Sequence, residues 1–329
     1  MSLLPGNVEV LAFGIQADKS TPAVAPVIAV ALEDCSVDPG VNFITLAESD
    51  ASALVGDDVI VGAGPGGTFK KYVRPSEEDF FLYNLLGKNV DTGAGAPYTH
   101  TANIDPTAPF ATPYLTMWDI WPGVATVQYV GTRIAQADFS SQAGSAWEAV
   151  YTTTALQAIM HAAEPDLTGL LIDELPFTWP EVAISLGGVH GGVVNTASLS
   201  IARATGRFPG DNGLTSFDIP NGLASVSGSL EVAFEDDSLW RAANTGSTVG
   251  TVLTPNVFSE AIAIALTRGA GLELAFNLAA AQIKNFKTAL KTDASPATST
   301  FDFKSLRSAT LSNVIQTVVK NAIAHGDRS

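Results

Sequence analysis

Three glycines after an apolar run have the spacing that most directly suggests chemistry. Gly62, Gly64 and Gly67 match the pattern G-x-G-x-x-G in the string DVIVGAGPGG, which begins at Asp58. In a dinucleotide-binding fold this turn opens into a helix whose N-terminus faces the pyrophosphate. Here the chain continues as TFKKYVRP, which is typical of a strand, and Pro75 would interrupt a helix. The motif therefore predicts a glycine-rich β-turn, and a flavin-binding enzyme is kept as an alternative.

The four histidines do not have the spacing of metal ligands. The nearest approach to a cluster is His161 with Glu164 and Asp166, in a proline-containing stretch that predicts a solvated linker. The sequence also lacks the G-x-S-x-G motif of a serine nucleophile. We therefore expect no enzymatic activity: no catalytic residues, no cofactor and no metal.

Two acidic clusters, residues 77–79 and 235–237, each precede a short apolar stretch with helical spacing. Carboxylates are favourable at a helix N-terminus, and Ser76 with Asp79 fits a capping box. The clusters therefore predict helix caps in preference to catalytic pairs of carboxylates. The two predicted helices span residues 76–86 and 237–244 and end at Gly87 and Gly246.

Most other regular structure is predicted to be β-strand. Within residues 226–234, polar residues alternate with Val226, Leu230 and Val232, as in a half-buried strand. Similar patterns occur at residues 197–201, 262–266, 272–276 and 314–319. The glycines at 269 and 271 predict a hairpin turn. Residues 279–290 form a possible helix.

Residues 88–113 show no periodicity and are rich in Thr, Ala, Pro and Gly. A loop of this length in a compact domain is usually functional or disordered. Tyr98, Phe110 and Tyr114 lie in it or at its end. The segment therefore predicts an assembly loop in which these three aromatic residues are candidates for contact with a neighbouring subunit.

The two halves of the chain resemble each other. Residues 137–159 align without a gap with residues 301–323, and seven of the 23 positions are identical, among them Phe139 with Phe303. The order of acidic cluster, apolar helical turn and glycine also occurs in both halves. Chance similarity between two β-rich halves is the alternative. The pattern predicts two tandem domains, residues 1–168 and 169–329, with a linker at 164–179.

Composition limits the classes of partner. Charged residues make up only 15% of the chain and apolar residues 46%, which indicates a surface partly covered by neighbouring subunits. The net charge of −16 opposes a phosphate-binding role. The apolar residues 261–283 are interrupted by Arg268 and Glu273, so we expect no membrane span.

With these elements in place, the sequence resembles the tail tube (major tail) proteins of long-tailed, non-contractile phages. The resemblance covers most of the chain and rests on patterns of residues. The segments that carry it are residues 129–134, 139–144, 176–186, 195–203 and 219–237.

The resemblance implies a mainly β fold: two tail-tube-type β-sandwich or barrel domains, each with one short flanking helix. It implies a virion protein, assembled in the host cytoplasm, whose copies join sheets edge to edge into rings of six domains. Its partners would be further copies of itself, a tape measure protein in the lumen, and tail terminator and tail-tip proteins. DNA would pass without specific binding.

Because two domains per chain allow three chains to complete six domains, we expect a trimeric ring in preference to a six-chain ring. A net negative lumen would repel the DNA backbone, so Asp and Glu are expected to outnumber Lys and Arg there. An array of surface or secreted β-sandwiches is kept as a structural alternative.

Overall fold

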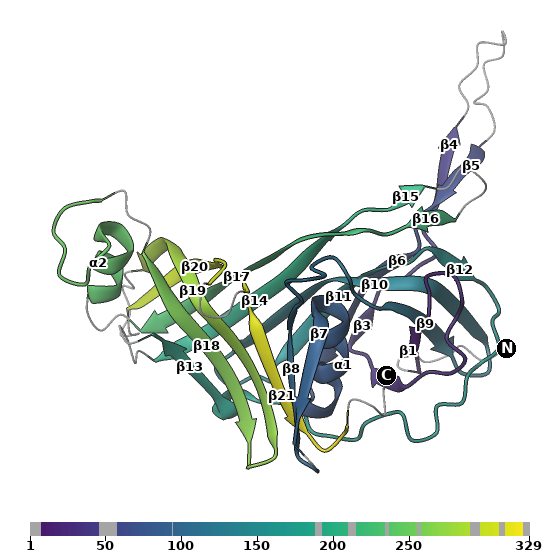
Figure 1. Cartoon of the computed structure of the whole chain (residues 1–329), viewed down its shortest axis with the longest axis horizontal. Helices are drawn as coiled ribbons and strands as arrows, with labels where there is room; N and C mark the ends of the chain where they lie inside the picture. Colours follow the sequence, from purple (N-terminus) through teal and green to yellow (C-terminus); the bar gives the residue numbers. More distant parts are fainter. Residues whose placement is uncertain are drawn as a thin grey trace, which may run out of the picture.

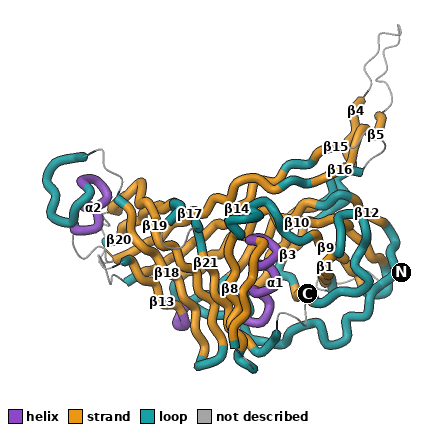
Figure 2. Tube along the Cα trace, viewed as in Figure 1, coloured by secondary structure: helices purple, strands orange, loops and turns teal. Residues whose placement is uncertain are grey.

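The computed structural model describes residues 8–45, 58–93, 95–187, 193–209, 215–233, 237–254, 258–289, 297–308 and 313–324. Within these residues the chain forms 21 strands, two α-helices and one 3-10 turn, Trp179–Glu181. Strands dominate the whole length of the molecule, as Figure 2 shows. The predicted mainly β fold with two short helices is therefore confirmed.

One large antiparallel sheet contains strands from both halves of the chain. Its strands, in order across the sheet, are β3 (Asp34–Cys35), β6 (Gly66–Tyr72), β11 (Glu148–Thr154), β10 (Ala125–Gln142), β14 (Val194–Thr205), β17 (Asn221–Ala233), β20 (Thr298–Ser305), β19 (Leu272–Ala289), β18 (Ser259–Arg268) and β13 (Val182–Leu186). From the first part of β19 a branch continues through β21 (Gln316–Asn321), β8 (Tyr98–Ile104) and β7 (Gly87–Thr92).

The long strand β10 belongs to two layers. Its second part lies in the large sheet, and its first part pairs with β9 (Tyr114–Trp121) and β12 (Gln157–Ile159). Strand β9 continues this second layer through β1 (Val10–Gln16) to β2 (Ile28–Ala31). Irregularities in register near Gly131 and Ala135 accompany the change of partner. The two layers close into a barrel.

Two short hairpins extend from one end of the molecule. They are formed by β4 (Val41–Thr45) with β5 (Asp58–Ala63) and by β15 (Phe208–Pro209) with β16 (Ser216–Asp218). Figure 1 shows β4 and β5 projecting beyond the barrel and α2 (Ser238–Thr245) at the opposite end. The glycine motif lies at the base of the β4–β5 hairpin: Gly62 is in β5 and Gly67 is in β6. A strand follows the motif, in place of the helix of a dinucleotide site, but the predicted β-turn is wrong, because residues 64–66 form an extended connection that hydrogen-bonds to Gly40 and Asp38.

Helix α1 (Pro75–Leu86) packs inside the barrel against strands of both halves, β10 of the first half and β21 of the second among them. The core is one continuous cluster that includes Phe13, Phe69 and Tyr151 from the first half and Phe276 from the second. Phe139 links the two parts, because its ring centre lies 4.8 Å from that of Phe276 and 6.1 Å from that of Tyr151. The halves therefore share a core.

The same order of strand pairing occurs twice in the chain. Pairing connects the strands of the first half in the order β1–β9–β10–β11–β6–β3. It connects those of the second half in the corresponding order β13–β18–β19–β20–β17–β14. In addition, α1 follows β6 in the chain as α2 follows β17. This correspondence matches β11 with β20, whereas the gapless sequence alignment matches β11 with β21. Repeated alternation makes several registers look alike in sequence.

The predicted capping box of α1 is wrong. The N-cap is Arg74, whose side chain makes no capping hydrogen bond, and Pro75 occupies the first helical position. The first turn is capped from a distant segment, because the Ser76 backbone N–H donates to the Glu174 carboxylate at 2.9 Å. Glu77 and Glu78 are buried, and their carboxylates bind the Lys71 ammonium at 2.7 and 2.5 Å. Tyr151 also donates a hydrogen bond to Glu78. Burial of the Lys71 ammonium lowers its pKa, but the two carboxylates together have the larger effect, so the Lys71 pKa is raised.

Both helices end as predicted, with left-handed glycines. Gly87 has a φ of 96° and Gly246 a φ of 74°, and the Gly87 N–H donates to the carbonyl of Tyr83. Asp237 is the N-cap of α2 without a side-chain cap hydrogen bond; the other two acidic residues of that predicted cap lie outside the described residues.

Two other predictions are wrong. Much of residues 88–113 is not loop, because β7 and β8 form a hairpin there. Residues 279–289 are not helical, because they continue β19 beside β20. The apolar residues of β19 alternate irregularly around bulges, and this irregular pattern resembles helical spacing.

Replacing Lys71 with Met should lower the free energy of unfolding by about 3–5 kcal/mol, because it leaves two carboxylates buried without their cation. Denaturant unfolding measures the effect. Lys70→Met is the matched control: Lys70 points to the other side of β6, is partly exposed and pairs with Glu33 and Glu148. Its loss should cost less than about 1 kcal/mol. Equal losses for the two variants would contradict the importance of the buried cluster.

Candidate functional site: the polar face of the large sheet

The large sheet has one apolar and one polar side. Along β14, Ala197, Leu199 and Ile201 are buried in the core, whereas Ser198 and Ser200 point away from it. We define the polar face as the polar residues on this second side of eight neighbouring strands and of the segment that follows β3. They are Asp34, Ser36, Asp38, Thr68, Lys70, Gln136, Asp138, Ser140, Gln142, Glu148, Thr152, Thr196, Ser198, Ser200, Ser225, Ser227, Ser229, Glu231, Gln282, Lys284, Lys287, Thr300, Asp302 and Lys304.

Strand register aligns hydroxyl groups in rows across the face. Ser140 lies opposite Ser198, Ser198 opposite Ser229, and Ser229 opposite Asp302. The Ser229 N–H donates to the Ser198 hydroxyl oxygen at 3.1 Å. Each row crosses from β10 to β14, so the two halves of the chain form one uninterrupted surface. Short hydroxyl side chains keep this surface hydrated and low in relief.

The charges of the polar face are mixed and partly paired. Among the described residues it has six carboxylates and four ammonium groups; they are Asp34, Asp38, Asp138, Glu148, Glu231 and Asp302, and Lys70, Lys284, Lys287 and Lys304. The Lys70 ammonium lies 2.9 Å from Glu148 and 3.1 Å from Glu33. Its hydrogen bond to Glu148 raises the Lys70 pKa. No arginine of these strands points to this side in the part of the chain that is described.

The two hairpins at the end of the molecule expose apolar side chains. Phe43 is 60% exposed and Val61 is 53% exposed on the β4–β5 hairpin. Phe208 and Phe217 are about as exposed, and their rings meet edge to face 6.3 Å apart. Apolar surface of this extent on projecting hairpins is typical of a region that another molecule covers.

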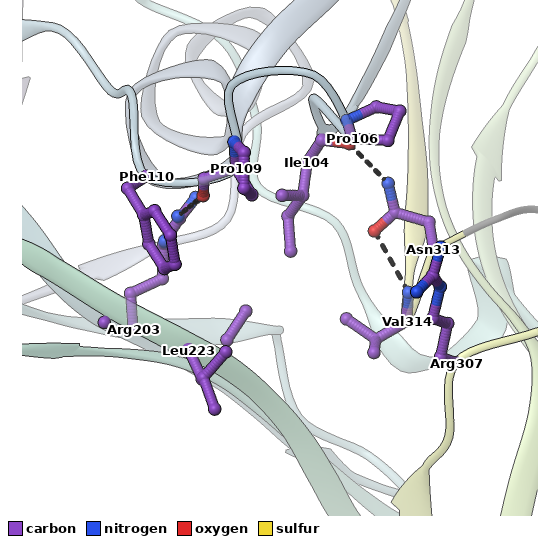
Figure 3. Close-up of a pocket in the computed structure, with 11 residues that line it drawn as sticks. Ile104, Pro106, Pro109, Phe110, Arg203, Leu223, Arg307, Asn313 and Val314 are labelled. Carbon is purple, nitrogen blue, oxygen red and sulfur yellow. Dashed lines mark hydrogen bonds between the residues drawn. The ribbon is translucent and has the colours of Figure 1, made fainter.

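A pocket of about 260 Å³ is lined by residues of β14 and β17, by the loop that follows β8 and by residues that precede β21 (Figure 3). The buried Arg203 guanidinium holds two of its walls together. It donates to the carbonyl of Leu86 at the end of α1, at 3.0 Å, and to the carbonyl of Pro109. Burial, with the nearby charge of Arg133, lowers the Arg203 pKa. Phe110, at the rim, is 54% exposed.

The structure does not bring the three predicted contact residues together. Tyr98 begins β8 opposite Asn321, whereas Phe110 lies beyond the other end of that strand. Tyr114 begins β9 and is occupied within the chain: its ring lies 4.0 Å from the Arg133 guanidinium carbon, and its hydroxyl donates to Asp218. Only Phe110 of the three is largely exposed.

The sequence-based search for sites missed the polar face as a functional surface. The signal was present, because serine occupies successive outward positions of two predicted strands, 198 and 200 in one and 227 and 229 in the other. Such serines read as ordinary solvent-facing residues until the pairing of β10, β14, β17 and β20 joins them into one face.

The described residues contain no group of three potential metal ligands. They also contain no helix long and apolar enough to cross a membrane.

Replacing Arg203 with Met should free the loop that carries Phe110. Because the buried carbonyls of Leu86 and Pro109 lose their charged donor, we expect a loss of about 2–4 kcal/mol in unfolding free energy. We also expect faster hydrogen exchange in residues 105–111. Arg241→Met is the control, since Arg241 forms an exposed pair with Asp237 at 2.6 Å. Unchanged exchange in the loop would show that Arg203 does not hold it.

Comparison with known proteins is consistent with this surface and fold. The family model described as phage tail tube protein matches residues 6–310, which is nearly the whole chain. No curated protein sequence matches the chain. This match agrees with a β-rich subunit that presents an extended polar sheet face and projecting apolar hairpins. The chain therefore belongs to the phage tail tube protein family, whose members are structural components of the virion tail.

Proposed function

We propose that three copies of this chain close a ring of six tube domains, that rings stack into the tail tube, and that the polar face lines the lumen. The observation that carries this proposal is the pairing of β10 with β14. This pairing already joins the two halves of one chain edge to edge. Since each half has the same order of strands, repeating the junction between chains would continue the sheet around a closed ring.

The polar face has the properties that a DNA conduit requires. Serine and threonine hydroxyls keep water at the wall, and six carboxylates against four ammonium groups give a weakly negative balance. A wall that contacted phosphates would release counterions and retain the DNA. The excess of carboxylates is small, so hydration and the pairing of charges contribute to the proposed passage together with net repulsion.

The exposed hairpins and the rim of the pocket provide contacts between stacked rings in this proposal. Phe43 and Phe208 lie on hairpins at the end of the sheet, and the Phe110 carbonyl accepts a hydrogen bond from Asn221, which begins β17 shortly after the β15–β16 hairpin. Phe110 thus remains our candidate assembly residue, whereas Tyr114 supports its loop from within and Tyr98 supports β8. We propose that tape measure, tail terminator and tail-tip proteins bind the completed tube.

The proposed role is passive, without catalysis or a cofactor, and we place assembly in the host cytoplasm. The family match favours a tail tube over an array of surface or secreted β-sandwiches. A strand in place of a helix after Gly67 disfavours the flavin-binding alternative.

Purified protein should form rings with a central hole, each containing three chains of 34.1 kDa. Negative-stain microscopy tests for the ring, and native mass spectrometry counts the chains. Rings of six chains would overturn the trimeric arrangement while leaving the tube. Monomers at all concentrations and salt conditions would contradict the proposed assembly itself.

Placing lysine on the proposed lumen wall should make the tube retain DNA. Ser200→Lys with Ser229→Lys adds two ammonium groups per chain to the polar face. Linear DNA should then be retained by tubes, and log affinity should fall with log salt by about 0.9 for each phosphate contacted. Electrophoretic retention measures this effect. The Ser200→Asn, Ser229→Asn pair controls for side-chain size, and identical behaviour of the two tubes would place the lumen on another surface.

A further inference from the structure

We infer that the ring closes between a lysine edge on β19 and an aspartate edge at β3, with Lys284 and Lys287 of one copy placed beside Asp34 and Asp38 of the next. This inference rests on the proposed ring and adds the contact that makes it. The partner is a second copy of the same chain, and the contact is a β-sheet junction with opposite charges on its two strands.

The internal junction is the template for this contact. In β10, residues Gln136–Gln142 pair on one side with β11 and on the other side with residues 196–202 of β14. Strand β19 has the position in the second half that β10 has in the first. Strand β3 likewise corresponds to β14, since β3 pairs with β6 as β14 pairs with β17.

The corresponding edges have no strand beside them in the described part of a single chain. Beyond Ile283, β19 pairs with β20 on one side, and no described strand lies on its other side. Among the strands that the structure describes, β3 pairs only with β6. Open edges expose a row of unsatisfied N–H and C=O groups, so they attract another strand. Antiparallel pairing of these two edges would satisfy both and extend the polar face.

The two edges carry opposite charge on the same face. Lys284 and Lys287 are exposed on the outward side of β19, and Asp34 and Asp38 are exposed on the outward side of the other edge. None of these four side chains forms an ion pair with another described residue, although Asp38 lies near enough to Arg207 to support the charge of that guanidinium. Because β10 and β19 both contain bulges, the β10–β14 template is compatible with two registers for the pairing of β19 with β3 of the next copy, and these registers differ by two residues.

Either register places a lysine opposite or diagonal to an aspartate, within reach of a cross-strand ion pair. The pattern also disfavours incorrect contacts, because lysine edge against lysine edge and aspartate edge against aspartate edge both repel. Charge thus gives the junction a direction, and a directional junction closes a ring by head-to-tail addition of identical copies.

Charge reversal tests this inference. Lys284→Glu with Lys287→Glu, or Asp34→Lys with Asp38→Lys, should lower the fraction of chains in rings by about tenfold or more. All four substitutions together should restore rings, because both edges are reversed and the net charge is unchanged. Ring fraction is measured by analytical ultracentrifugation, and thermal unfolding checks that each variant is folded.

The matched control separates edge charge from charge in general. Lys304→Glu makes the same change as Lys287→Glu on the same face, but Lys304 lies in β20, which is paired on both sides. We expect rings from Lys304→Glu and loss of rings from Lys287→Glu. Rings from both, or failure of the fourfold variant to restore them while wild type forms rings, would overturn the inference. Absence of rings from wild type would instead overturn the proposed function.

A mixture of the Lys→Glu double variant with the Asp→Lys double variant gives a second, independent test of the number of chains in a ring. Each variant repels its own kind and matches the other, so a closed ring must alternate between them. An even number of chains permits alternation, whereas a ring of three chains leaves one repelling junction. We expect the fourfold variant to restore rings and the mixture not to restore them. Rings from the mixture would support the edge contact and overturn the trimeric count.

Discussion

The satisfaction of strand edges is the constraint on which the rest of this structure depends. A large sheet must pair, cover or charge the N–H and C=O groups of its outer strands. Within the chain, the edge N–H and C=O groups of β10 in the first half are satisfied by pairing with β14. In the second half the corresponding strand is β19, whose last residues have a described partner on one side only. Edge pairing thus shapes both the monomer and its means of association.

The buried charge of Lys71 fixes how the core meets this sheet. Lys70 and Lys71 are neighbours in β6, yet one lies on the polar face and the other lies in the core against two glutamates of α1. Removing two carboxylates from water is costly unless a cation binds them. The cluster therefore fixes the position of α1 relative to β6 and β11 and supports the strand face that the subunit presents.

Sequence reasoning found the β character, both helices with their glycine ends and the strands around Ser198 and Ser227, because period-two alternation and left-handed glycines are local signals. It failed where local signals mislead. The serine and carboxylates at the start of α1 resemble a cap in sequence, but the tertiary fold buries Glu77 and Glu78 against Lys71. Bulges disturb the alternation of β19, which therefore resembles a helix in sequence. The three aromatic contact candidates separate because β8 extends between Tyr98 and Phe110.

The sequence by itself determined that this protein is β-rich, acidic, internally similar between its halves and a member of a structural family. Those properties depend on composition and short-range spacing. Only the tertiary structure decided which strands are neighbours, because pairing joins residues more than 50 positions apart, as in Ser140 opposite Ser198 and Ser229 opposite Asp302. Long-range register therefore turns scattered serines into one polar face and places lysines and aspartates on opposite edges of one sheet.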